Sequence, residues 1–141
     1  MALYAVYESA VTEIAQLMQQ SLSQGISIKD LKGDFLERAK KYYSHILKFD
    51  LYTEGKAWQR VKMLAELRNA FAHVNGRMEM LNEKSRKIIN NWEGQKAGIT
   101  TYSGYIVCDA KIVAEVFQTV RVSLEDLLAR FRQWDDNQSH A

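Results

Sequence analysis

The segment AELRNAFAHVNGR, residues 65–77, holds an arginine, an asparagine and a histidine at a spacing that could serve one phosphate group. These residues are Arg68, Asn69 and His73. In a helix, positions four residues apart differ by about 40° around the axis, so Asn69 and His73 would share a face. Arg68 would flank that face, and its long side chain could reach round to it.

This combination suits cleavage of a phosphodiester without a metal ion. RNA carries its own nucleophile, the 2′-hydroxyl group. Histidine moves protons near neutral pH, and arginine is a forked donor that fits phosphate oxygens. Asn69 would orient the imidazole or bind the phosphate. Because His73 lies near a predicted helix C-terminus, where the helix dipole favours a cation, we expect it to act as the general acid for the leaving 5′ oxygen.

The bare pattern of an arginine followed by a histidine is common, and a second match occurs in this chain. Arg38 and His45 stand in ERAKKYYSH, but no asparagine follows the arginine, and the basic neighbours are typical of a solvated helix face. We interpret that match as accidental. A single histidine in a helix is more often structural than catalytic, so the residue types alone leave both readings of His73 open.

Positive charge is concentrated around this segment. Residues 56–90 carry eight Lys or Arg against three Glu, a net charge of +5, whereas the whole chain carries +2. Such a concentration suits an anionic ligand, although a solvated helix face gives the same pattern. We expect Lys62 and Arg77 to contact RNA if RNA is the ligand.

Three further residues have two readings each. Glu8 interrupts an apolar helix face and would either pair with Arg68 or lie on the surface. Trp58 and Tyr102 would either stack on bases or pack in the core.

Composition excludes several classes of protein. A length of 141 residues favours one domain. Cys108 is the only cysteine, which excludes a disulfide framework and a cysteine-based zinc site and fits the reducing cytoplasm. The stretch MALYAVYESAVTEIAQ lacks a basic region and contains two Glu, so we do not expect a signal peptide. We also expect no membrane span, no metal and no cofactor.

Apolar residues recur at intervals of three and four, which predicts helices. The expected helices are 2–23, 27–49, 53–74, 79–93 and 109–134, and a polar tail of residues 135–141 follows the single domain 1–134. The third has an apolar stripe of Val61, Leu64, Leu67, Phe71 and Val74, and the stripe of the last begins at Val113. Ser27 with Asp30 three residues later is expected to cap the second helix, Asn75-Gly76 to end the third, and Asp109 to cap the last. The β-branched segment GITTYSGYIVCD, with its Ser-Gly turn, predicts a hairpin. We therefore predict an all-α protein, an antiparallel bundle of four to five helices with a small β-hairpin before the last helix.

The sequence LAELRNAFAHVNGR resembles the signature of the HEPN superfamily, which is an arginine, a polar residue that is usually asparagine, about three residues and a histidine. The segments LYAVYESAVTEI, EGKAWQRVKML and GYIVCDAKIVAEVF are also similar to the family's layout, so the resemblance covers about residues 2–132, although only residues 68–76 are specific. It implies a helical bundle that forms a homodimer with a composite active site. It further implies a metal-independent endoribonuclease of toxin–antitoxin or phage-defence systems, with Arg68 and His73 catalytic and Asn69 supporting.

The resemblance has one departure and leaves one alternative. Minimal HEPN toxins often carry a tyrosine shortly after the histidine, whereas Val74, Asn75 and Gly76 follow His73 here. This puts in doubt an antitoxin that modifies such a tyrosine, while another antitoxin or regulatory protein remains compatible. Other members of the superfamily have lost catalysis. A silent dimer that binds RNA or a protein is therefore the alternative to an RNA-cleaving enzyme.

Overall fold

The structure is a computed structural model that describes residues 2–74, 76–94 and 98–139, without the side chains of residues 2, 3 and 72–74. Its regular elements are α1 (Ala2–Ser21), α2 (Phe35–Lys41), α3 (Gly55–Val74), α4 (Glu83–Gly94), β1 (Ile99–Tyr102), β2 (Tyr105–Cys108) and α5 (Ala110–Ser139). Turns of 3₁₀ helix occupy Ile28–Asp30 and Met78–Met80, and a π-helical turn, Tyr42–Ile46, continues α2. The predicted helical bundle with a hairpin before the last helix is confirmed.

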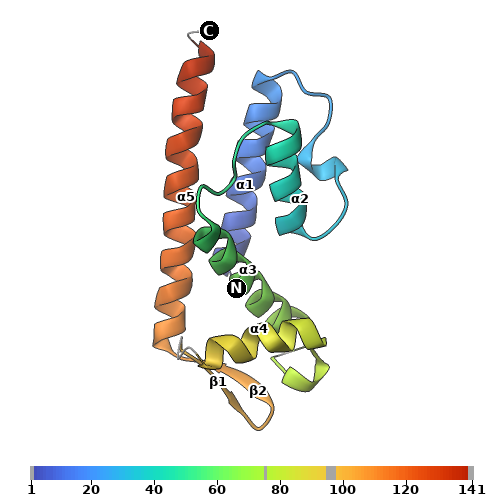
Figure 1. Ribbon diagram of the computed structural model, residues 1–141, viewed down its shortest axis with the longest axis vertical. Helices are drawn as coiled ribbons and strands as arrows, with labels where there is room; N and C mark the ends of the chain where they lie inside the picture. Colours follow the sequence, from blue (N-terminus) through green and yellow to red (C-terminus); the bar gives the residue numbers. More distant parts are fainter. Residues whose placement is uncertain (1, 75, 95–97, 140–141) are drawn as a thin grey trace.

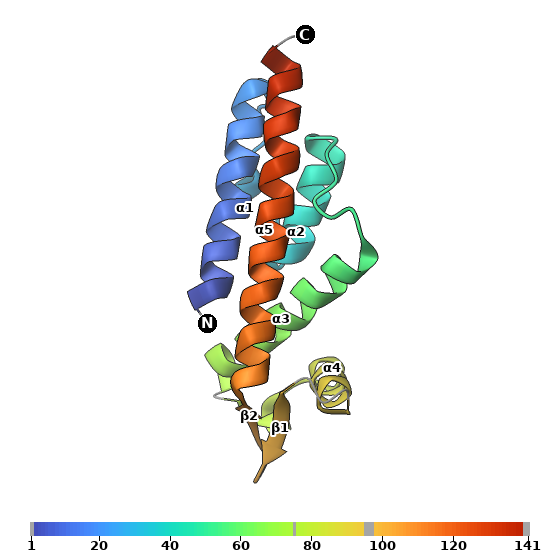
Figure 2. The same ribbon diagram turned by 90° about the vertical axis from the view of Figure 1, so that its left-hand side faces the viewer.

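The helices form an elongated bundle (Figures 1 and 2). α1, α2 and α5 run roughly along its long axis, and α3 crosses beneath them towards α4 and the hairpin. α1 packs along α5, and the two point in the same direction because the intervening elements return the chain to the end where α1 begins. Within the described ranges, none of the helices combines the length and apolarity that a membrane crossing requires.

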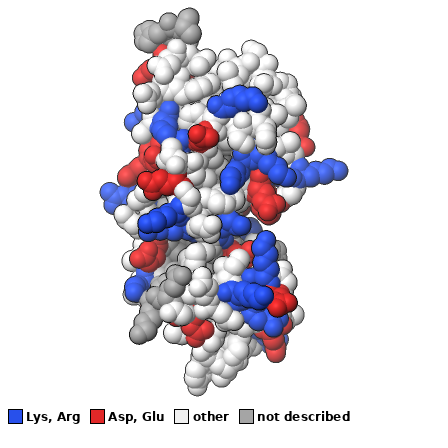
Figure 3. Space-filling model, viewed as in Figure 1, with Lys and Arg blue, Asp and Glu red and all other residues white. Residues whose placement is uncertain are grey.

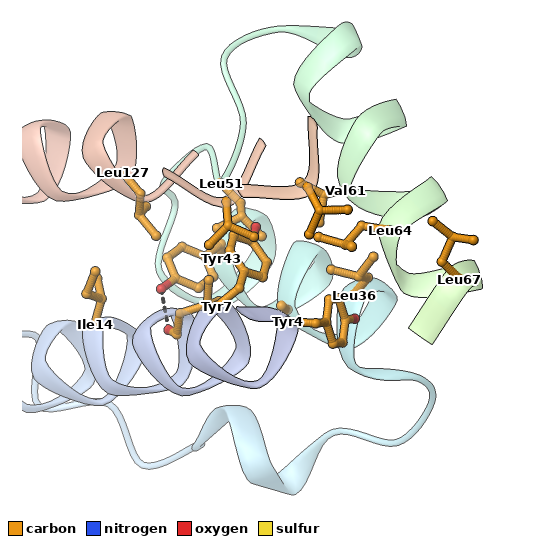
Figure 4. Packing of buried hydrophobic residues seen from close by; sticks show 14 of the residues in the cluster. Tyr4, Tyr7, Ile14, Leu36, Tyr43, Leu51, Val61, Leu64, Leu67 and Leu127 are labelled. Atoms are coloured by element: carbon orange, nitrogen blue, oxygen red, sulfur yellow. Dashed lines mark hydrogen bonds between the residues drawn. The ribbon is translucent and has the colours of Figure 1, made fainter. Parts of the chain in front are cut away.

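The core draws side chains from α1, α2, α3 and α5 (Figure 4), and it is rich in tyrosine. A buried phenol needs a hydrogen-bond partner, and each of the fully buried tyrosines has one. The Tyr43 hydroxyl donates to the carbonyl of Val11 at 2.6 Å, and the Tyr7 hydroxyl meets that of Tyr52. Tyr42 donates in the same way to the carbonyl of Ile26 at 2.6 Å. The first two bonds tie α1 to the chain that follows α2, and the third ties the π-helical turn to the segment before α2.

The predicted single helix over residues 27–49 is wrong. Ser27 and Asp30 do form the expected capping box, but they cap only one turn of 3₁₀ helix. The chain then breaks at Gly33, whose φ of 115° suits glycine, and Asp34 caps α2 by accepting from the backbone N–H of Glu37 at 3.0 Å. A second capping residue, seven positions after the first, therefore restarts the helix.

The other boundaries shift less. α3 begins at Gly55 rather than at residue 53, with the carbonyl of Glu54 accepting its first helical bond from Trp58. Asp109 caps α5 as expected, accepting from the N–H groups of Lys111 and Ile112 at 2.9 and 3.2 Å. α5 then continues through Ser139, so residues 135–139, expected as a polar tail, are helical.

The apolar stripe of α3 is only partly as predicted. Leu64 and Leu67 are 1% exposed, but Phe71 is 36% exposed, and Ala70 takes the buried position instead. The side chain of Val74 is outside the described part of the structure. Among the described side chains of α3, Ala70 is therefore the last one that is buried.

Leu64→Ala is therefore expected to destabilise the fold more than Phe71→Ala does. A buried leucine truncated to alanine costs about 2–5 kcal/mol because a cavity remains. The 3–5 kcal/mol typical of a buried phenylalanine does not apply to Phe71, which is already in contact with water. Urea denaturation followed by circular dichroism measures both free energies of unfolding, and an equal loss in the two variants would contradict this boundary of the core.

Candidate functional site

The last two turns of α3 carry Arg68, Asn69 and His73. The backbone is α-helical through all three positions, so Asn69 and His73 lie one turn apart along one face, as predicted. Leu64 and Leu67 bury the opposite side of the helix, which anchors this segment. The side chain of His73 is outside the described part of the structure, and its place here rests on the backbone.

Gly76 terminates this helix. Its φ is 76°, and its N–H donates to the carbonyl of Ala70 at 3.0 Å, closing the last turn. A Cβ at this position would lie 3.1 Å from the ring of Phe71. Asn75, which we expected to share the role of helix stop, is outside the described residues. The glycine therefore fixes where the helix ends, three residues after His73.

Arg68 is held by two neighbours. Its guanidinium carbon lies 5.7 Å from the ring centre of Tyr4 on α1, and its Nη1 donates to Oδ1 of Asn69 at 3.3 Å. Because Oδ1 of Asn69 accepts this bond, the amide N–H groups of Asn69 remain as donors, and this side chain is exposed. Burial raises the pKa of the Tyr4 phenol above its ordinary value, the Glu8 carboxylate raises it further, and Arg68 opposes both. Tyr4 therefore stays neutral and serves as a platform for the arginine.

A pocket of about 210 Å³ lies beside this pair. Its walls come from α1, the start of α2, α3 and the start of α4, and its lining residues are Tyr4, Glu8, Asp34, Phe35, Leu36, Glu37, Trp58, Lys62, Ala65, Glu66, Arg68, Asn69 and Lys84. The pocket thus brings together five of the residues singled out in the sequence, Glu8, Trp58, Lys62, Arg68 and Asn69. Among the described residues, Glu8 and Arg68 do not form an ion pair. Arg68 instead contacts Tyr4 and Asn69.

The pocket is of mixed charge, unlike the +5 segment that supplies much of it. Four carboxylates and three cations line it, because α1 and the start of α2 contribute acids that face the basic side of α3. On the face of the molecule drawn in Figure 3, Lys and Arg are spread across the middle, with Asp and Glu among them. Counting charges along the sequence identifies the basic segment, but it does not identify the acidic residues of α1 and α2 that face this segment in the folded chain.

Arg77 lies apart from this pocket. It follows the end of α3, and its Nε donates to the hydroxyl of Tyr105 on β2 at 3.0 Å. Trp58 is partly buried and packs against Tyr52 with ring centres 5.4 Å apart, which fits the packing reading. Tyr102 is 76% exposed, so the core reading of this residue is wrong.

Sequence reasoning missed Tyr4 and Lys84. Tyr4 stands four residues before Glu8, the spacing of one helix face, which was a usable signal. Lys84 reaches the pocket because α4 is fixed on α3, where the hydroxyl of Ser85 donates to a carboxylate oxygen of Glu66 at 2.7 Å. Asn82 caps α4 by accepting from the N–H of Ser85 at 2.8 Å. No pattern within the sequence of either helix predicts this bond between Ser85 and Glu66.

The second Arg–His match builds no comparable site. Arg38 packs on the ring of Phe35, 5.7 Å from its centre, while His45 is exposed on the π-helical turn. In the part of the chain that the structure describes, His, Cys, Asp and Glu side chains form no group of three suited to a metal ion.

The chain was also compared with known proteins. It matches no protein-family model, no curated protein and no solved structure.

Proposed function

We propose that this protein is a metal-independent endoribonuclease of the HEPN type that cleaves single-stranded RNA. The observation that carries the proposal is the pairing of Arg68 with Asn69 on the accessible side of α3, one helical turn before His73. These three residue types can bind a phosphate and move a proton, and the buried side of the same helix holds them in place.

The proposed reaction is a transesterification. The 2′-oxygen attacks phosphorus, the bond from phosphorus to the 5′-oxygen breaks, and the products end in a 2′,3′-cyclic phosphate and a 5′-hydroxyl. His73 gives its proton to the leaving 5′-oxygen. N–H groups of Arg68 and Asn69 stabilise the charge on the phosphate oxygens. A second His73, from another copy of the chain, accepts the proton of the 2′-hydroxyl.

The mixed charge of the pocket decides where the phosphate binds in this proposal. Glu8 and Glu66 line the same pocket as Arg68 and would repel a phosphate placed deep inside. The scissile phosphate therefore lies at the rim, along the line from Asn69 to His73. The same carboxylates favour the second candidate, a silent binding module, if they hold the arginine away from RNA.

A homodimer supplies the second histidine. α1 and α5, which pack on each other, both leave large apolar side chains in water. Val6 is 53% exposed on α1, and Val113 and Phe117 are 61% and 53% exposed on α5. The prediction that Val113 lies in the core is wrong, because its neighbour Ile112 is buried and Val113 faces outwards. Exposed apolar side chains of this size are typical of interfaces, and we propose that a second copy covers them.

The cellular role follows from the proposed chemistry. A ribonuclease that cuts cellular RNA needs restraint, so we propose a toxin or phage-defence role in the cytoplasm, under an antitoxin or another regulatory protein.

Cleavage of a mixed RNA pool in EDTA tests the proposal directly. We expect the wild-type protein to cut it and to leave 2′,3′-cyclic phosphate ends, because no step needs a metal ion. Treatment of the products with a phosphatase that cannot remove cyclic phosphates, before and after acid opening of the ring, identifies the ends. Cleavage that appears only when a divalent cation is added would refute this mechanism.

A further inference from the structure

The hairpin has one face in the core and one in water. Register pairs Ile99 with Cys108 and Thr101 with Ile106, and Ile99 and Ile106 are buried. The other face carries the pairs Thr100 with Val107 and Tyr102 with Tyr105. Tyr102 and Tyr105 are 76% and 42% exposed, so both members of this cross-strand pair lie in solvent beside the Ser103–Gly104 turn. No charged residue occurs in residues 98–108.

Arg77 completes this surface. Its guanidinium carbon lies 5.5 Å from the ring centre of Tyr105, and its Nε donates to the hydroxyl of the same residue at 3.0 Å. An arginine side chain has five N–H donors, so this bond leaves others for an anion. We call the surface of Arg77, Tyr102 and Tyr105 the tyrosine face.

The tyrosine face is fixed to the end of the helix that carries His73. The N–H of Ile106 donates to the carbonyl of Gly76 at 2.8 Å, and the N–H of Met78 donates to the carbonyl of Gly104 at 2.9 Å. Residues 76–78 thus lie against β2 like a third strand. Gly76 lies three positions after His73 and is held to β2 by a backbone bond, which gives the face a set position relative to the proposed scissile phosphate.

We propose that the tyrosine face binds single-stranded RNA next to the cleaved bond, with bases stacked on the tyrosine rings and a phosphate on Arg77. Stacking explains why two large aromatic rings stay in water on a strand pair that could have carried polar residues. Charge complementarity favours RNA over an apolar protein surface, since the only charged group of the face is a cation. The inference rests on the proposed function, because it takes RNA as the substrate.

Substitutions at Tyr102 test the inference, because a side chain so exposed can change without loss of the fold. The probe is a short fluorescent single-stranded RNA with methylated 2′-oxygens, which binds but cannot be cleaved, measured by anisotropy in EDTA. Stacking of one base contributes about 1–3 kcal/mol, so Tyr102→Ala should weaken binding by about 5- to 150-fold. Tyr102→Phe keeps the ring and should bind as the wild type does.

Tyr102→Leu distinguishes RNA from a protein partner. Leucine keeps an apolar surface but has no π-face, so it should lose binding to RNA as alanine does. Arg77→Gln should weaken binding and also lower the salt dependence by about one phosphate contact, a slope change of about 0.7 on logarithmic axes. A face that served a protein or a second copy would leave RNA binding of all four variants unchanged, which would overturn the inference.

The design separates this failure from failure of the proposed function. Wild-type protein that cleaves unmodified RNA, with binding unaffected at Tyr102, refutes only the tyrosine face. Binding that falls in Tyr102→Ala and Tyr102→Leu, by a protein that cleaves nothing, supports the face and leaves the protein as an RNA-binding module. Wild-type protein that neither binds nor cleaves refutes both.

Discussion

Replacement of His73 by alanine should lower the rate of RNA cleavage by about 10²- to 10⁴-fold, the usual contribution of a general acid–base group. The fold should survive, because the buried α3 residues that the structure describes, Val61, Leu64, Leu67 and Ala70, all stay unchanged. Single-turnover cleavage in EDTA measures the rate, and circular dichroism measures the fold. Equal rates in the variant and the wild type would show that cleavage occurs elsewhere or comes from a contaminant.

His45 offers a matched control for this experiment. It is the histidine of the other Arg–His match, and its side chain is exposed on the π-helical turn. His45→Ala should therefore cleave at the wild-type rate. Arg68→Lys adds a second comparison, because lysine keeps the charge but loses the planar fork that matches phosphate oxygens. A large loss in Arg68→Lys would mean that geometry at this position matters, and not charge alone.

Phe117→Glu should convert a dimer into monomers. If a second copy covers the apolar residues of α5, a glutamate there buries an unpaired charge, which costs several kcal/mol. Because 1.4 kcal/mol is a factor of ten, the dimer should weaken by about 100-fold or more. Light scattering after gel filtration gives the mass of the wild type and of the variant. A wild-type protein that is monomeric at high concentration would contradict the proposed interface.

Val122→Glu is the matched control for that change. Val122 is 49% exposed on the same helix but lies five residues from Phe117, about 140° round the axis. The same new charge at this position should leave the dimer intact. If the active site is composite, Phe117→Glu should also lose cleavage, and Val122→Glu should keep it. Loss of cleavage without loss of the dimer in Phe117→Glu would point to a direct effect on the site.

Local patterns in the sequence were sufficient for most of the fold. The Ser103–Gly104 turn between β-branched segments predicted the hairpin, and the cap at Asp109 predicted the start of α5. The helix over residues 27–49 failed because its apolar spacing continues across Gly33, whose backbone cannot continue the helix. Val113 and Ile112 differ by only 100° on α5, so the sequence does not decide which of them faces the core.

The candidate site was predictable only within α3. Arg68, Asn69 and His73 share one helix, so spacing alone relates them. Their surroundings depend on tertiary packing, because Tyr4 comes from α1 and Lys84 from α4. The platform under Arg68 and the acids of the pocket arise where helices distant in sequence meet. A composite site would be harder still to predict from the sequence, because half of its residues would come from a second copy of the chain.

Because residues 76–78 pair with β2 like a strand, the chain between them, which contains α4, forms a loop whose two ends are joined by backbone bonds. The backbone bonds from Met78 to Gly104 and from Ile106 to Gly76 close this loop of residues 79–103. The hydrogen bond from Ser85 to Glu66 attaches the loop to α3 as well. Opening of this segment as one cooperative unit would expose Ile89, Trp92 and Ile99, but it would leave in place the tyrosine bonds between α1 and the chain after α2. In native-state hydrogen exchange, the amide protons of Met78 and Ile106 would then share one opening free energy, lower than that of the amides of α1. A regulator that bound α4 could thereby loosen or tighten the end of α3 without touching the motif.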